Sequence, residues 1–525
     1  MLIALLPIFL VFASIVFVLA SLIKRSELAT RLAKLLAIAF SAIAAFASLV
    51  VLQHVLESGI VVYYFGGFKP PLGIVYVVDA LSALFAFLSM TMLLVTCIYS
   101  YWFMGSKWSY LYYSLLFLMA AGSVGCIYTG DLFNLYVAAE LLAISCYALV
   151  AYYRDSSRAI MASLRYAISG SIAISILFFS VVVIYGAYGT LNMADIALKM
   201  RDPLANVPFS GRVVGDITLP TKVAVSLMVW VFLFKIGIVP IGFAWQPHAY
   251  AEAPTPISAG MTAIADSAGL YLFIRLFYTI LGKDVELLYS FRLAVLGVVQ
   301  VVAVFSAIIA ALLMCVEGDV KKFIAYSTIS QFSLALLGAC ADSEVGVASA
   351  ILTVISNILG DATLFYIAGL AIVACGRGLT CMAVATTSKL IFKSMLIAML
   401  NLFGILPVLV GFWAKALLVM AYIEKSVVIV ALVLVISGIT AVGYFRVLHV
   451  AFTHKPTLKR DERLKETAIP LATILALTAT TVALGLLFAL SMEFRELLLK
   501  ISLEVVVNSK EYINVALGFK EIVWS

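Results

Sequence analysis

Apolar runs of about twenty residues recur along the whole chain, with short segments rich in glycine, proline and charge between them. A helix of about twenty residues crosses the hydrocarbon core of a bilayer, which is roughly 30 Å thick. The runs are continuous and do not alternate between apolar and polar positions, so they predict helices rather than barrel strands. We expect an all-α polytopic membrane protein with about fourteen spans, near 1–23, 31–52, 78–103, 109–128, 131–153, 162–187, 220–245, 256–278, 290–316, 322–341, 346–374, 391–422, 426–450 and 467–491.

The orientation of these spans follows from the basic loops. Lysine and arginine are densest between Lys24 and Lys34 and between Lys455 and Lys465, and both segments follow odd-numbered spans. Because cytoplasmic loops are enriched in these residues, both loops are predicted to be cytoplasmic. An even number of spans then places both termini outside. The first run lacks the basic start of a cleavable signal and is interpreted as a helix of a multi-pass protein of the cell (inner) membrane.

Composition narrows the function. Of 525 residues, 65% are hydrophobic and 12% are charged, which excludes a soluble domain. The net charge of +7 arises largely from the loops, and the basic residues form no face typical of nucleic-acid binding. Seven cysteines without metal-ligand spacing are interpreted as small packed residues, and four histidines lie at or beyond span ends. The chain has no P-loop or dinucleotide motif, so we expect no metal, no cofactor and no catalytic centre.

Ionisable residues deep in the predicted spans are the candidate functional groups, because a charge inside the bilayer is costly and usually marks a pathway or a pair. Glu140 lies nine residues after Asp131, which places it about 14 Å along its helix. Lys235 lies thirteen residues from both Lys222 and His248, about 20 Å from either end. The alternative is a static buried ion pair that fixes helix packing. The internal ionisable residues are Glu140, Lys235, Asp266, Asp361 and Lys415.

Helix-breaking residues accompany two of these charges. Gly237 and Pro240 follow Lys235, and Gly404 and Pro407 precede Lys415. Proline removes a helix hydrogen bond and glycine loosens the backbone, so spans seven and twelve are predicted to be discontinuous. The fifth and tenth spans also begin with loosely matching strings, GDLFNLY and GDVKKFIAY. Paired interrupted helices indicate a transporter with inverted repeats.

Four segments in this order carry a resemblance: GDLFNLYVAAELLAISCYALVAYY, FKIGIVPIGFAWQPHAYAEAPTPISA, GDVKKFIAYSTISQ and GILPVLVGFWAK. They resemble the antiporter-like membrane subunit family, which includes the D-type subunit of Mrp cation/proton antiporters, the proton-pumping membrane subunits of complex I and their relatives in membrane-bound hydrogenases. The segment GGFKPPLGIVYVVDALSALFAF is more similar to the D-type Mrp subunit and the hydrogenase relatives. The resemblance covers roughly residues 60 to 450 and implies a fourteen-helix core with two inverted five-helix repeats.

This core divides the chain into four parts. Residues 1–103 form helices one to three, with a hairpin predicted on the outer face near 58–78 from its glycines, prolines and β-branched residues. Residues 109–278 form the first repeat, helices four to eight, and 290–450 the second, helices nine to thirteen. Residues 467–525 hold the last helix and a segment from Met492 that is too polar to span, either an amphipathic helix on the membrane or a partner, or a surface helix.

The resemblance also implies roles for single residues. Glu140 and Lys235 match a family pair whose making and breaking gates proton movement, and Arg165 in SLRYAISG matches a position that is often basic. Lys415 matches the lysine of the twelfth span, where a proton enters or exits.

Two family positions differ in this chain, and a third differs from some relatives. Ser267, with Asp266 beside it, stands where the eighth span usually has a lysine. Ser356, Asn357 and Asp361 stand where the eleventh span often has basic residues, and Gln331 replaces a histidine of some relatives. Either the buried carboxylates form an altered proton pathway, or the protein no longer pumps.

Three functions remain open. The first is a proton- or cation-translocating subunit of a multisubunit redox-driven pump, with iron–sulfur or hydrogenase-like partner subunits. The second is a component of a multisubunit Mrp-type Na⁺/H⁺ antiporter that corresponds to its D-type subunit. The third is a structural membrane subunit that has lost pumping.

Overall fold

The structure is a computed structural model that describes residues 1–22, 27–105, 109–455 and 462–519. Helices make up nearly all of this described chain, and twelve of them are long and apolar enough to cross a membrane. The chain is therefore a helical multi-pass membrane protein, as its apolar runs predict. The twelve are α1 (Leu2–Ala20), α2 (Glu27–Ser58), α3 (Ala80–Phe103), α4 (Ser109–Tyr128), α5 (Leu132–Val150), α6 (Ser157–Tyr188), α8 (Thr218–Ile236), the helical stretch Thr255–Ile280, α12 (Tyr289–Val316) with the short turn η5 (Glu286–Leu288) before it, α14 (Glu344–Ala374), α17 (Val427–Thr453) and α18 (Ala468–Leu490).

The number of spans and the two inverted repeats, 109–278 and 290–450, stay predictions. Two further helices, α13 (Val320–Ala339) and the shorter apolar α16 (Val410–Tyr422), also belong to the bundle. Lys24, Arg25 and most of the segment from Lys455 to Lys465, on which the predicted orientation depends, lie outside the described residues.

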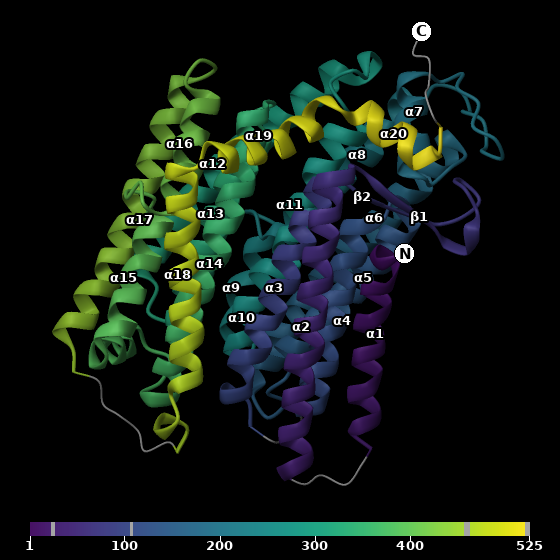
Figure 1. Cartoon of the computed structure of the whole chain (residues 1–525). Helices are drawn as coiled ribbons and strands as arrows, with labels where there is room; N and C mark the ends of the chain where they lie inside the picture. Colours follow the sequence, from purple (N-terminus) through teal and green to yellow (C-terminus); the bar gives the residue numbers. More distant parts are fainter. Residues whose placement is uncertain (23–26, 106–108, 456–461, 520–525) are drawn as a thin grey trace.

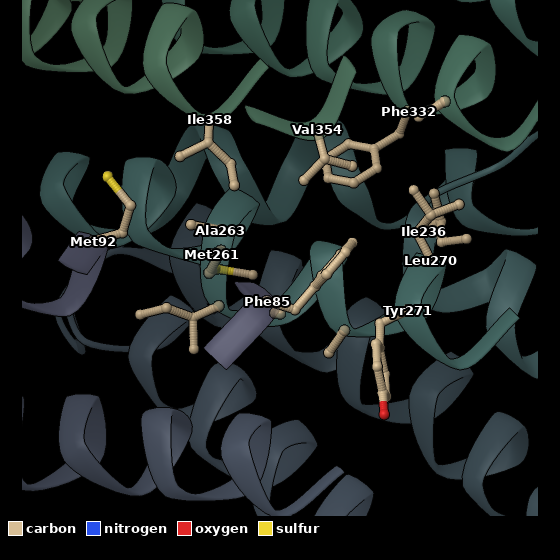
Figure 2. Packing of buried hydrophobic residues seen from close by; sticks show 14 of the residues in the cluster. Phe85, Met92, Ile236, Met261, Ala263, Leu270, Tyr271, Phe332, Val354 and Ile358 are labelled. Carbon is tan, nitrogen blue, oxygen red and sulfur yellow. The ribbon is translucent and has the colours of Figure 1, made fainter. Parts of the chain in front are cut away.

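The long helices stand side by side, with α1–α6 toward one side of the bundle and α12–α18 toward the other (Figure 1). Between them lies the stretch Thr255–Ile280, whose four segments are α10 (Thr255–Met261), η3 (Thr262–Asp266), α11 (Ser267–Ile274) and η4 (Arg275–Ile280). Every residue from Thr255 to Ile280 is buried. Figure 2 shows Met261 and Ala263 of this stretch in one hydrophobic cluster with Phe85 of α3 and Ile358 of α14, and α10 contacts both helices. This central helix therefore joins the two sides of the hydrophobic core.

Side-chain caps explain where several helices begin. Asp79 accepts a hydrogen bond from the backbone N–H of Ser82, and the Ser82 hydroxyl accepts one from the N–H of Asp79, which forms a capping box for α3. Asp131 caps α5 and Asp319 caps α13 in the same way, by accepting from backbone N–H groups of the first turn. The matching strings GDLFNLY and GDVKKFIAY therefore both place an aspartate at a helix N-cap.

The helices predicted to be interrupted both end at a glycine. α8 ends at Ile236, where Gly237 adopts the left-handed conformation with φ +85°, and α9 (Gln246–Glu252) begins after the short turn η2 (Gly242–Ala244). α15 (Lys389–Phe403) ends at Gly404 with φ +75°, and α16 begins at Val410. Glycine adopts this conformation without the steric cost of a Cβ atom. The first interruption is buried at Gly237, Ile238 and Val239, so its backbone groups need partners inside the bundle, whereas residues 405–408 of the second are exposed.

One end of the bundle carries the remaining elements. The strands β1 (Val61–Tyr64) and β2 (Val75–Val78) pair as an antiparallel hairpin around η1 (Phe65–Gly67), within the segment where a hairpin is predicted. α19 (Met492–Val507) and α20 (Ser509–Leu517) run across this end, nearly perpendicular to the spans (Figure 1). The helix α7 (Met193–Arg201) packs against α20. We call Met492–Leu517 the C-terminal arm, and it covers the bundle end instead of crossing it. The turns η6 (Leu379–Thr387) and η7 (Glu462–Lys465) complete the described elements.

Candidate functional site

Lys235 lies in the last turn of α8, one residue before the helix ends. Its Nζ atom is 3.5 Å from the carbonyl oxygen of Ala139, the residue before Glu140 on α5. Among the ion pairs that join described residues, none connects Lys235 to Glu140. Both side chains are partly exposed in the isolated chain. The structure thus brings the lysine to the turn that carries Glu140, but not into contact with its carboxylate.

Asp266 is fully buried at the end of the π-helical segment η3. Its Oδ2 atom accepts hydrogen bonds from Gln246 Nε2 at 2.8 Å and from the Tyr250 hydroxyl at 2.5 Å. Both donors are neutral and lie on α9, the helix that begins after the interruption of α8. Asp266 Oδ1 and Gln246 Oε1 are buried without a hydrogen-bond partner among the described residues. Ser267 is also buried, and its hydroxyl donates to the Ala263 carbonyl of its own helix.

The interruption at Gly237 makes this arrangement possible. A Cβ atom at position 237 would lie 1.4 Å from Gln246 Oε1, so only glycine leaves room for the Gln246 side chain. Next in the chain, the backbone N–H of Val239 donates to Ser306 Oγ on α12, and Ser333 on α13 donates to the same oxygen at 3.0 Å. The Val239 N–H of the broken helix therefore has a side-chain acceptor on α12, which satisfies its hydrogen-bonding capacity in an apolar surrounding.

Asp361 is the buried carboxylate of the second half of the bundle. It lies on α14 and is fully buried, and its Oδ2 atom accepts a hydrogen bond from Thr328 Oγ1 at 2.6 Å. Ser327 Oγ lies 3.4 Å from its Oδ1 atom and 2.7 Å from the Tyr444 hydroxyl on α17. The neighbours that bond this carboxylate are thus neutral, as at Asp266.

Lys415 lies on α16 beside the second interruption. Its Nζ atom donates to the carbonyl of Phe403, the last residue of α15, at 2.7 Å. The last carbonyls of a helix lack partners within the helix and carry partial negative charge, which favours a cation there. Asn401 completes the junction, since its Nδ2 atom donates to Ser356 on α14 and its Oδ1 atom accepts from the N–H of Gly411 on α16. The two halves of this broken helix are therefore held to α14.

Arg165 does not join these groups, because its side chain is exposed on α6. The other members of the predicted set divide into two neighbourhoods. The first contains Lys235, the Glu140 turn, Asp266 and Ser267, and the second contains Asp361 and the junction at Lys415. Gly237, Pro240, Gly404 and Pro407 lie in the two chain interruptions between the half-helices.

Several polar residues around the carboxylates cannot be found from sequence alone. Gln246 and Tyr250 lie on a short helix that follows a break in the chain. The hydroxyl groups of serine and threonine in helices often bond the backbone of their own helix, so the sequence gives no sign that Ser327, Thr328 and Ser333 have partners on other helices. The only available signal for Gln246 and Tyr250 is their spacing of four residues, which places both on one helix face. Their common partner comes from another helix, and sequence spacing does not reveal it.

Two of the seven cysteines correct the interpretation that all are small packed residues. Cys375 and Cys381 form a disulfide across the turn between α14 and η6, where Gly376 adopts a positive φ of 137° that favours glycine. Cys97, Cys126, Cys146 and Cys340 are buried free thiols, in line with the interpretation. In the described part of the chain, no three His, Cys, Asp or Glu side chains come together as a metal site.

Comparison with known proteins agrees with this architecture. Residues 129–440 match the family described as NADH:quinone oxidoreductase/Mrp antiporter, transmembrane. NADH-quinone oxidoreductase subunit N of Desulforudis audaxviator is 30% identical over 447 residues, which cover 81% of this chain and 84% of the relative. The D-type subunit of the Na⁺/H⁺ antiporter of Bacillus subtilis is 28% identical over 496 residues, or 93% of this chain and 94% of the relative.

Solved structures show the same fold. A chain of the membrane-bound sulfane sulfur reductase, an archaeal respiratory membrane complex, superposes with a TM-score of 0.83 at 28% identity and covers 97% of this chain and 99% of its own. A chain of the Mrp complex from a Dietzia species gives 0.84 at 22% identity, with 99% and 100% covered. Because the family model spans more than half of the 525 residues and a 30% identical relative matches most of the chain, this protein belongs to the NADH:quinone oxidoreductase/Mrp antiporter membrane family.

Proposed function

We propose that this chain is the proton- or cation-translocating membrane subunit of a multisubunit redox-driven pump. The observation that supports this most is the placement of ionisable side chains at the two interrupted helices. Lys235 ends α8 beside the Glu140 turn, and Lys415 reaches the terminal carbonyl of α15. Between them lie Asp266 and Asp361, each buried and bonded by neutral donors. A purely structural helix bundle would not need four such costly groups.

In this mechanism the Glu140–Lys235 pair is a gate. The Lys235 ammonium contacts a backbone carbonyl one residue from Glu140, so a small side-chain movement forms or breaks an ion pair. With the carboxylate close, the charge on the lysine is stabilised and its proton is held. With the carboxylate distant, this attraction is lost, and the proton can pass to a neighbouring group or water. Ser, Thr and Tyr hydroxyls and bridging waters then connect the lysine to Asp266 and onward.

The energy source lies in partner subunits. The chain has no cofactor motif, and we propose that it binds no cofactor and has no catalytic centre of its own. Its likeness to a chain of the sulfane sulfur reductase, a respiratory membrane complex, supports a redox-driven complex. We propose that the partner subunits of this chain are iron–sulfur or hydrogenase-like. We further place the chain in the cell (inner) membrane with both termini outside, on the strength of its basic loops.

A second candidate is the D-type component of a multisubunit Mrp antiporter. Its support is the match to the Bacillus subtilis antiporter protein along 93% of this chain. Purifying the native complex separates the two candidates by its co-eluting subunits. Iron–sulfur or hydrogenase-like subunits, with electron-driven ion uptake by vesicles, support the pump. Only small membrane subunits, with cation-driven proton movement, support the antiporter. A complex that moves no ion under either driving force contradicts both and leaves a structural role.

A further inference from the structure

α9 is a short helix that carries two hydrogen-bond donors of the buried carboxylate at Asp266. It consists of seven residues, and its Gln246 and Tyr250 side chains bond the same Asp266 oxygen at 2.8 and 2.5 Å. A helix of this length is not stable alone and depends on tertiary contacts. The contacts that hold α9 therefore also determine how firmly both donors are kept on the carboxylate.

The last turn of α9 has an unfavourable charge. Glu252 is its last residue, and the C-terminal end of a helix already carries partial negative charge from carbonyl groups that lack partners within the helix. A pocket of about 470 Å³ lies against this turn and is lined, among others, by Glu252, Ala253, Lys321 and Arg377. On this side the last turn meets a cavity instead of closely packed side chains. A nearby positive charge is therefore needed to hold this end of α9.

Two cations from the second half of the bundle supply this charge. Arg377 Nη1 donates to both carboxylate oxygens of Glu252, each at 2.9 Å, and Arg377 Nη2 lies 3.0 Å from Oδ2 of Asp319, the N-cap of α13. Lys321 lies in the first turn of α13 and is 2% exposed, and its Nζ atom donates to the carbonyl of Ala253, directly after α9. We call Glu252, Asp319, Lys321 and Arg377 the α9 clamp, because they fasten the end of α9 to the start of α13.

The backbone that carries Arg377 is itself fixed. Cys375 and Cys381 form a disulfide on either side of it. The carbonyl of Arg377 accepts a hydrogen bond from the N–H of Val320, at the start of α13, at 3.1 Å. A fixed backbone reduces the conformational entropy that the arginine loses when it bonds Glu252. The loop is thus suited to hold a guanidinium group in one place.

We propose that Arg377 is a positioning residue for Asp266. It acts through Glu252, by holding α9 against α13 so that Gln246 and Tyr250 stay on the carboxylate. The inference rests on the proposed function, in which Asp266 takes part in the proton route. It goes beyond that function because it gives a residue at the end of the bundle control over a carboxylate inside it.

Hydrogen exchange and ion translocation of the assembled native complex test the α9 clamp. Arg377→Gln removes the charge that bonds Glu252, so backbone exchange in Gln246–Glu252 should become at least about tenfold faster and translocation in vesicles should fall at least about threefold. Glu252→Gln removes the other partner and should reproduce both changes. Arg201→Gln is the matched control, since Arg201 pairs with Asp284 at 2.8 Å but belongs to α7. It should leave exchange in α9 and translocation unchanged.

A double-mutant cycle separates positioning from a general loss of stability. If Arg377 acts through the bond from Tyr250 to Asp266, Arg377→Gln should lower translocation by less than about twofold in a Tyr250→Phe background, where that bond is already absent. An equal loss in both backgrounds overturns the proposal. Unchanged exchange of α9 in both Arg377→Gln and Glu252→Gln overturns it as well. If Arg377→Gln does not assemble, Glu252→Gln takes its place in the cycle.

The two readouts also keep this inference apart from the proposed function. Faster exchange of α9 with unchanged translocation contradicts the positioning role and leaves the proposed function. Faster exchange of α9 in the clamp variants of a complex whose wild type moves no ion contradicts the proposed function and leaves the α9 clamp.

Discussion

At the scale of single residues, the position of Lys235 relative to Glu140 defines the first test. Lys235→Ala removes the only ammonium group that reaches the Glu140 turn in the described structure, and Glu140→Gln removes the charge that would hold its proton. We expect either substitution to reduce ion translocation by the complex in vesicles to background, with normal amounts of the chain in the membrane. Lys222→Ala is the control, since Lys222 lies on α8 thirteen residues earlier and should not affect transport. Normal proton movement by both variants would contradict the gate.

Substitution of Asp266 tests whether this buried carboxylate takes part in ion translocation or only stabilises the packing of helices. Asp266→Asn keeps an oxygen that can accept from Gln246 and Tyr250, so the packing of α9 should survive. If the carboxylate takes part in the route, we expect a loss of transport of at least about tenfold, which corresponds to roughly 1.4 kcal/mol. The combination with Asp361→Asn discriminates further. A structural role without pumping predicts that neutralising both carboxylates leaves ion movement by the complex unchanged.

At the scale of elements, the interruption of α8 depends on one glycine. Gly237→Ala puts a Cβ atom on a residue with φ +85° and into the space of Gln246 Oε1. The left-handed conformation alone costs about 1–2 kcal/mol for a residue other than glycine. We expect a lower apparent melting temperature of the purified complex, together with loss of transport, because Gln246 can no longer bond Asp266. Gly186→Ala on α6 is the control, since a Cβ there meets no atom within 4 Å. A melting temperature that is equal in both variants would count against the role of Gly237.

An element can be predicted from the sequence when neighbouring residues in the chain determine it, and not when contacts between distant residues do. The apolar runs and the glycine–proline pairs are local signals, so the spans, the hairpin and the ends of α8 and α15 can be predicted from neighbours in the chain. The partners of Asp266 are not local, because Gln246 and Tyr250 reach it only after the chain has turned back at the interruption. The disulfide between Cys375 and Cys381 likewise depends on the turn that connects α14 to η6. The exposure of Arg165 depends on which face of α6 the bundle covers, and a near-uniformly apolar helix does not reveal that face.

At the scale of the whole molecule, a buried arginine of the bundle contacts the C-terminal arm. Arg275, in the central helix, pairs with Asp79 at the start of α3 at 2.7 Å and lies 4.8 Å from the ring centre of Tyr512 on α20. The sequence leaves open whether this arm lies on the membrane, on a partner or on the protein surface. In the structure α19 and α20 pack on the bundle end itself, and Tyr64 of the hairpin approaches the backbone of α20 at 3.4 Å.

This geometry predicts that Tyr512 holds α20 in place. Tyr512→Ala removes a buried ring and its cation–π contact with Arg275, and truncation of a buried aromatic side chain costs about 3–5 kcal/mol. Since α20 is a short helix at the edge of the bundle, we expect that loss to appear as local opening of the arm and not as unfolding of the spans. Hydrogen exchange of the purified complex should therefore accelerate strongly in Ser509–Leu517 and stay unchanged in α3. Tyr512→Phe keeps the ring and should retain most of the protection. Equal exchange in the arm of Tyr512→Ala and the wild type would show that α20 is held by other contacts, and acceleration that extends into α3 would show that the arm and the bundle open as one unit.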